Sequence, residues 1–255
     1  DLKLVDPLTL NAGTLHTQGA DLNLQGALTL QNNSLIDSTG GMLALFVGGT
    51  VDNSSELDVP GTDLHLRNVL GLTLPNTTIT GTLSTDTGTD IQRYGGVIDL
   101  SGGLLKLGGD LNLAGTVTDN DTRLILQADA TLGNSASTGI GSLDLNGSAL
   151  TISMAMTIND LLTLDVAGEQ LVTGNADLSL NGGISATAGT LSSTGGTLGL
   201  PIGGTLASGA LFSTSNTTLN LGGSLAVAGT WSGSNTTSIS LTTDNASLSS
   251  TVALS

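Results

Sequence analysis

The chain has 255 residues, a formal net charge of −16 and 37 glycines, but only one Trp, one Tyr and two Phe. Five Lys and Arg against 21 Asp and Glu argue against binding to nucleic acid, which requires cations to neutralise phosphates, and against an anionic membrane surface. Because 38% of the residues are apolar and recur with regular spacing, the chain has surface to bury, which excludes overall disorder.

The N-terminal part alternates apolar and polar residues in short pairs. These pairs are Leu2-Lys3-Leu4, Leu8-Thr9-Leu10, Leu22-Asn23-Leu24 and Leu28-Thr29-Leu30. Such alternation predicts strands with one apolar face, separated by corners at which Gly and Asn tolerate positive φ. Residues 21–41 and 42–62 each predict one coil of about 20 residues.

Residues 63–96 fit this pattern less well. The pairs around His65 and Thr73 continue it, but Pro75 and a polar run over residues 82–90 lengthen the segment. We therefore expect a loop excursion at about residues 75–96 in an otherwise single domain over residues 1–255. The longest apolar run, residues 42–47, is far below the roughly 20 residues that span a bilayer, so no membrane insertion is expected. The chain begins at Asp1 without Met or a signal peptide, and we expect a mature form or a fragment.

The alternation returns at residue 97 and is most continuous over residues 150–164. The last piece, residues 239–254, is weaker and predicts a final or truncated coil. The whole chain predicts roughly 12–13 coils of an all-β parallel β-helix, also called a β-solenoid. Cysteine is absent, so neither disulfides nor thiolate metal sites are available.

Residues 197–231 contain two copies of a repeat unit of about 20 residues. The pair around Gly199 aligns with the pair around Asn220, and Phe212 aligns near Trp231. The same alignment sets Gly203-Gly204-Thr205-Leu206 over Gly222-Gly223-Ser224-Leu225 and predicts that each Gly-Gly pair is a turn.

The sequence of residues 108–117 (GGDLNLAGTV) and of residues 221–231 (LGGSLAVAGTW) resembles the repeats of filamentous-haemagglutinin-like adhesins. Those are large bacterial surface proteins, exported by a two-partner or autotransporter route. The resemblance extends over nearly the whole chain, in the length of the repeats and in the residue types that recur in them. It implies a right-handed parallel β-helix that forms an extracellular rod on the bacterial cell surface and displays or spaces adhesive regions. The N-terminal secretion domain expected of such proteins is not in this sequence.

A polysaccharide lyase or hydrolase, or a glycan-binding module, is the alternative, because such enzymes place carboxylates in a lateral groove. The available carboxylates are Asp86, Asp90, Asp99, Asp119 and Asp121, with Arg93 and Arg123 near them in sequence. Paired carboxylates serve glycoside hydrolysis, but the sequence does not fix their separation. Polysaccharide sites also favour aromatic platforms, and only Tyr94 lies in this region. We therefore expect solvated corner residues and no catalytic residues, with Arg93 and Tyr94 as binding candidates in the excursion.

Calcium is the one ion for which the sequence offers candidates. Asp119 and Asp121 flank Asn120, but the segment continues without the Gly and the later Glu of an EF-hand. We therefore expect a turn here, with no cofactor.

The function expected is non-enzymatic: a structural or adhesive element of a bacterial surface protein or extracellular fibre. A host surface or a glycan is the expected partner. No helical or charged cap is evident near Asp1 or Ser255, and open coil ends expose strand edges. Self-association end to end is therefore also expected.

Overall fold

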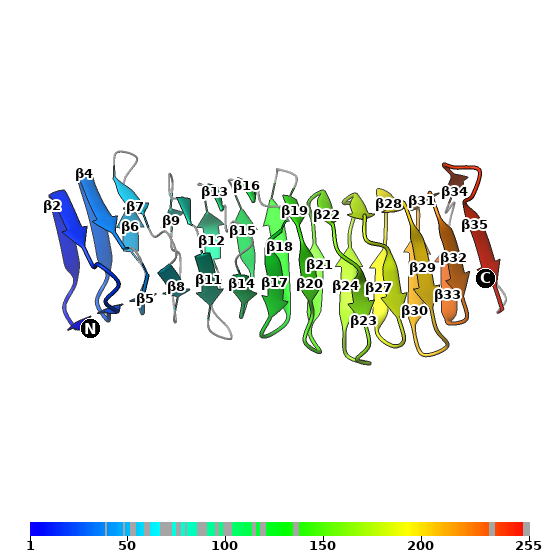
Figure 1. The fold of residues 1–255 in the computed structure, drawn as a ribbon, viewed down its shortest axis with the longest axis horizontal. Helices are drawn as coiled ribbons and strands as arrows, with labels where there is room; N and C mark the ends of the chain where they lie inside the picture. The colour runs from blue at the N-terminus through cyan, green and yellow to red at the C-terminus, as the bar shows by residue number, and fades with distance from the viewer. Residues whose placement is uncertain are drawn as a thin grey trace. The chain divides into compact units, whose positions relative to one another are not determined.

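The computed structural model describes residues 1–251 except for 39, 48, 52–54, 59–61, 67–72, 75–77, 80, 86–90, 95–96, 99–103, 114–115, 118–120, 135–137 and 235–237. The chain divides into two compact units, Asp1–Ala136 and Ser137–Ser255. The described residues of both form parallel strands and contain no helix (Figure 1).

The first unit contains two long ladders of parallel strands. One ladder consists of β1 (Leu2–Leu4), β3 (Leu22–Leu24), β5 (Met42–Leu45), β8 (Thr62–Leu66), β11 (Gly81–Thr85), β14 (Leu104–Leu107) and β17 (Arg123–Leu126). The other consists of β2 (Leu8–His16), β4 (Leu28–Asp37), β6 (Gly49–Val51), β9 (Thr73–Leu74), β12 (Ile91–Tyr94), β15 (Leu111–Leu113) and β18 (Ala130–Asn134). A third, short ladder holds β10 (Thr78–Ile79), β13 (Val97–Ile98) and β16 (Thr116–Val117), and β7 (Glu56–Asp58) pairs with β4.

The second unit has three ladders, one on each face of the coil. The first consists of β21 (Ala149–Ile152), β24 (Gln170–Thr173), β27 (Thr190–Ser193), β30 (Leu211–Ser215) and β33 (Thr230–Ser234). The second, which we call the central ladder, consists of β19 (Thr138–Ile140), β22 (Met156–Ile158), β25 (Leu178–Leu180), β28 (Thr197–Leu200), β31 (Thr218–Leu221) and β34 (Ser238–Leu241). The third consists of β23 (Leu162–Leu164), β26 (Ile184–Ala186), β29 (Gly203–Leu206), β32 (Ser224–Val227) and β35 (Ser247–Ser250), and β20 (Ser142–Asp144) lies beside β23.

Leucines stacked from coil to coil form the core of the first unit. Six leucines follow one another in register through the first ladder: Leu22, Leu43, Leu64, Leu83, Leu105 and Leu124. Each is at most 2% exposed. Full burial of one such side chain contributes about 1.5–3 kcal/mol, so every added coil supplies its own share of the core. The predicted all-β parallel solenoid with coils of about 20 residues is confirmed.

The described part of residues 75–96 belongs to the coils. Strand β11 pairs in register with β8 and β14, and β12 pairs with β9 and β15. These two strands therefore lie in the ladders, and the excursion stays a prediction for the residues between them. Residues 75–77, 80, 86–90 and 95–96 lie outside the described residues.

The repeat in residues 197–231 is confirmed in two of its three segments. Gly199 pairs with Asn220, and Phe212 pairs with Trp231, whose ring centroid lies 5.0 Å away. The Gly-Gly alignment is wrong, because Gly203 and Gly204 belong to β29 and pair with Ser224 and Leu225. The corner before β29 is formed by residues 201–202 instead, whereas residues 222–223 do form a corner.

A cluster of polar side chains lies in the core of the second unit, on strands of its first ladder. Thr173, Ser193 and Thr214 follow one another in register and are at most 1% exposed. The Nε1–H of Trp231 donates to Thr214 Oγ1 at 3.0 Å, and Thr217 Oγ1 donates to the carbonyl oxygen of Ser193 at 3.1 Å. Thr173 Oγ1 has no hydrogen-bond partner.

The cluster provides a matched pair of substitutions. Thr173→Val replaces a hydroxyl without a partner, so the free energy of unfolding is expected to stay equal or rise by up to about 1 kcal/mol. Thr214→Val removes the acceptor of the buried Trp231 Nε1–H and is expected to cost about 1–3 kcal/mol. Urea unfolding of both variants measures the difference, and an equal loss in both would contradict the assignment.

Candidate functional site

The central ladder presents a row of small and polar residues to solvent. Its middle positions are in register, and we call them the outward row: Gly139, Thr157, Ser179, Gly199, Asn220 and Ser240. The residues on either side of Thr157, Ser179, Gly199 and Asn220 point into the core, as strand alternation requires. Leu198 and Leu200, for example, flank Gly199 and are at most 1% exposed.

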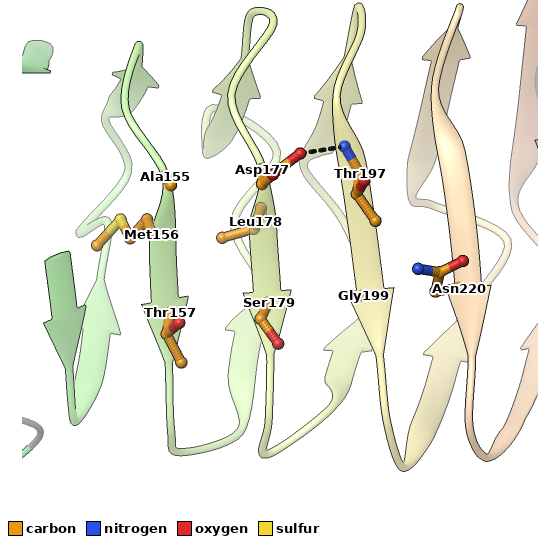
Figure 2. A pocket seen from close by; sticks show the side chains of 9 residues that line it. All are labelled: Ala155, Met156, Thr157, Asp177, Leu178, Ser179, Thr197, Gly199 and Asn220. Atoms are coloured by element: carbon orange, nitrogen blue, oxygen red, sulfur yellow. Dashed lines mark hydrogen bonds between the residues drawn. The ribbon is translucent and has the colours of Figure 1, made fainter. Parts of the chain in front are cut away.

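A shallow hollow of about 330 Å³ lies over this row (Figure 2). It spans β22, β25, β28 and β31, so four successive coils contribute to it. The lining residues are Ala155, Met156, Thr157, Asp177, Leu178, Ser179, Thr197, Gly199 and Asn220.

The hollow depends on Gly199, which lacks a side chain between Ser179 and Asn220. A Cβ built on Gly199 would meet the Ser179 Oγ at 3.4 Å and no nearer atom. The backbone at this position therefore does not require glycine, in contrast to Gly203, whose φ is +82° and whose Cβ would lie 1.9 Å from the Ser224 carbonyl oxygen. At residue 199 glycine leaves the hollow open. At residue 203 the packing of two coils leaves no room for a Cβ.

Asp177 lies at the edge of the hollow and joins two coils. Its Oδ1 accepts the backbone N–H of Thr197 at 2.7 Å (Figure 2). Asp21 Oδ1 accepts the N–H of Met42 at 3.0 Å, and Asp110 Oδ1 accepts that of Thr131 at 2.6 Å. Each of these aspartates directly precedes a Leu-x-Leu strand and reaches the first residues of a strand in the next coil. We call these three residues the coil-bridging aspartates.

The hollow offers hydrogen bonds from neutral groups. The Ser179 Oγ donates to Asn181 Oδ1 at 2.9 Å, and Asn181 Nδ2 donates to Asn159 Oδ1 at 2.9 Å, which fixes this side of the row. The Asn220 amide supplies donors and an acceptor, and the Thr157 hydroxyl supplies both. Asp177 is the one titratable residue among the nine lining residues. This arrangement suits recognition of hydroxyl groups and lacks the second carboxylate that glycoside hydrolysis uses.

A second hollow of about 240 Å³ lies on the third ladder of the same unit. Its lining residues are Thr205, Leu206, Ala207, Ala226, Val227, Ala228, Ser249 and Thr251. It contains neither an amide side chain nor a carboxylate, so the hollow over the outward row is the better candidate for a polar ligand.

The predicted site residues lie elsewhere. Arg93 and Tyr94 are consecutive in β12, where the backbone pairs them with Thr73 and Leu74, and the description does not extend to their side chains. Their binding role stays a prediction. Arg123 is exposed at the start of β17. Asp86, Asp90 and Asp99 lie outside the described residues.

The structure describes only one of the two calcium candidates. Asp121 is exposed in a turn, and Asp119 lies outside the described residues. Within the described part of the chain, no group of three His, Cys, Asp or Glu side chains is arranged to hold a metal ion. The same residues contain no helix with the length and apolar character of a membrane span.

The sequence contained a signal for the coil-bridging aspartates that we did not interpret. The segments Asp21-Leu22-Asn23-Leu24, Asp110-Leu111-Asn112-Leu113 and Asp177-Leu178-Ser179-Leu180 share one pattern. The hollow itself had no such signal, because it depends on which residues become neighbours across four coils.

Comparison of the chain with models of protein families, with curated proteins and with solved structures gave no match. The fold therefore establishes the class of molecule, a parallel β-solenoid. The resemblance to adhesin repeats supports a proposal about function and does not identify a family.

The two glycines predict opposite effects of the same substitution. Gly199→Ala places a methyl group on a strand at van der Waals distance from Ser179 Oγ, 3.4 Å away, so the free energy of unfolding is expected to rise by about 0.5–1 kcal/mol. Gly203→Ala forces a Cβ against a backbone carbonyl and is expected to cost more than about 2 kcal/mol. Thermal or urea unfolding measures both, and tolerance of alanine at residue 203 would contradict the packing described for β29 and β32.

Proposed function

We propose that this chain is a non-enzymatic structural and adhesive element of a bacterial cell-surface or extracellular fibrous protein, of the filamentous-haemagglutinin-like type. Its adhesive contact is the hollow over the outward row, and its ligand is a neutral glycan. The hollow lined by Thr157, Ser179, Gly199 and Asn220 is the observation that carries this proposal.

The geometry of the hollow supports a carbohydrate ligand. Hydroxyl and amide side chains stand on strands about 4.8 Å apart, so donors and acceptors recur along the direction in which the coils stack. A sugar chain presents hydroxyl groups at regular intervals and is matched by such a row. The open form of the hollow suits part of a long polymer better than a small molecule that must be enclosed.

The charge of the second unit favours a neutral ligand. Residues 137–255 contain six Asp and Glu residues and no Lys, Arg or His. One of the six, Asp177, lines the hollow itself. Sulfated, sialylated or uronic-acid polymers would meet like charge with no cation to offset it. Acidic glycans should therefore bind more weakly than neutral ones.

The buried and exposed surfaces support a structural role beside the adhesive one. Stacked apolar rows and parallel ladders make each coil depend on its neighbours, and the chain extends by adding coils. The coil-bridging aspartates use carboxylates to hold coils together, which accounts for part of the acidic composition without catalysis. An extracellular surface location follows from the proposal and is part of it.

The experiment measures binding of the purified chain to immobilised neutral and acidic polysaccharides. Gly199→Val places a larger side chain in the hollow, with its Cβ 3.4 Å from Ser179 Oγ, and Asn220→Ala removes the amide, so each is expected to weaken binding about tenfold or more. The control is Gly174→Val, the same change at a position with no atom within 4 Å of the added Cβ, and it should bind like the parent chain.

Three outcomes would contradict the proposal. These are failure to bind any neutral polysaccharide, undiminished binding by the Gly199→Val variant, and stronger binding of acidic polymers. Reducing ends or unsaturated sugars released during the assay would instead indicate the alternative function, a polysaccharide-active enzyme.

A further inference from the structure

The hydroxyl proton of Ser179, in the outward row, is directed to a side chain outside the hollow. Ser179 Oγ donates to Asn181 Oδ1 at 2.9 Å, and Asn181 does not line the hollow. A serine hydroxyl carries one proton and two lone pairs, so it can normally donate or accept. With its proton engaged by Asn181, Ser179 faces the hollow as an acceptor.

Asn181 is held in place by the preceding coil. Its Nδ2 donates to Asn159 Oδ1 at 2.9 Å, and its backbone N–H donates to the carbonyl oxygen of Ile158 at 2.8 Å. The two asparagines occupy the same corner position in successive coils, directly after β22 and β25. Because the amide nitrogen of Asn181 points to Asn159, the amide oxygen is the atom that meets Ser179.

The corner position changes in the following coil, where Pro201 comes directly after β28. Proline has neither a side-chain amide nor a backbone N–H, so the pair of asparagines does not continue there. Asn181 Oδ1 therefore receives its proton from Ser179, within the same coil. The residue types at this corner thus determine which way the Ser179 hydroxyl points.

Asp177 adds a second acceptor on the same side of the same coil. It lies two residues before Ser179, so strand alternation places both side chains over the outward row (Figure 2). One carboxylate oxygen accepts the Thr197 N–H, and the other has no partner in the described part of the chain. An ionised carboxylate only accepts. The middle of the hollow therefore presents acceptors, whereas Thr157 and Asn220 on its flanks can also donate.

We propose that Asn181 is a positioning residue that makes the hollow selective for glycans with free hydroxyl groups over glycans in which these groups are O-methylated or O-acetylated. A free sugar hydroxyl donates to Ser179 or to Asp177. An ether or ester oxygen can only accept, so it would face another acceptor and leave both without a proton. The inference rests on the proposed glycan-binding function and adds the chemical form of the glycan.

The experiment measures binding of the purified chain to dextran and to galactomannan, two neutral polysaccharides, and to an O-methylated derivative of each. The readout is the ratio of the affinities for the unsubstituted and the methylated polymer. The bulk of the methyl groups lowers affinity in the parent and in the variants alike, so a change of this ratio reports hydrogen bonding. In Asn181→Ala the Ser179 proton is released and can reach an ether oxygen, so the ratio is expected to fall about threefold or more.

Asn181→Asp is the matched control. The new carboxylate can only accept, so Ser179 must still donate to it, and the ratio should stay as in the parent chain. Asn159, whose Oδ1 loses its donor, can present its amide nitrogen instead. Asn181 is exposed, so both variants should fold, and circular dichroism checks this. Ser179→Ala removes the acceptor itself and should weaken binding of the unsubstituted polymer.

The outcomes separate this inference from the proposed function. If the parent chain binds neither polysaccharide in either form, the proposed function fails and the inference fails with it. If the parent binds but Asn181→Ala leaves the ratio unchanged, the inference alone is overturned. A ratio that rises in Asn181→Ala would show that the amide of Asn181 donates to Ser179, which is the opposite arrangement. An equal fall in the Asn181→Asp and Asn181→Ala variants would also overturn it.

Discussion

The packing of each coil on the next is the interaction on which the rest of the structure depends. A single coil of about 20 residues encloses too few side chains to form a core of its own, so its leucines are buried by the leucines of its neighbours. Parallel backbone hydrogen bonds run in the same direction as this apolar stacking. The coil-bridging aspartates add a side-chain acceptor between coils. A break in any of these contacts should therefore weaken two adjacent coils before it affects distant ones.

This constraint separates the inner and outer residues sharply, and the proposed functions follow from that separation. Inner positions hold mainly Leu, Ile and Val, and the few buried polar groups include Thr214, which accepts a hydrogen bond from the Nε1–H of Trp231. Outer positions are not constrained by burial in the core, and in the central ladder they carry Thr, Ser, Gly and Asn in register. A ligand surface can therefore change without disturbing the core. The last coils are the exception, because there the inner rows themselves reach the surface, as Leu241 does.

The fold was predictable because its signal is local and repeated. Alternating Leu-x-Leu pairs identify strands, and their recurrence after about 20 residues identifies coils, so Leu22, Leu43 and Leu64 could be placed in successive turns. Corner positions were less predictable. Residues 150–164 show the most continuous alternation in the chain, yet they turn two corners and contribute to β21, β22 and β23. Gly203 and Gly204 have the composition of a turn but lie in a strand, where a Cβ would collide with the Ser224 carbonyl oxygen at residue 203 and with that of Ile184 at residue 204.

The candidate site was not predictable, because register across four coils creates it and no sequence motif marks it. Amide hydrogen exchange tests the central claim, dependence of each coil on its neighbours, most directly. At low protein concentration, amides of β27 and β30, which have paired strands on both sides, should exchange more slowly than those of β34 and β35. Equal exchange rates in all these strands would contradict the account.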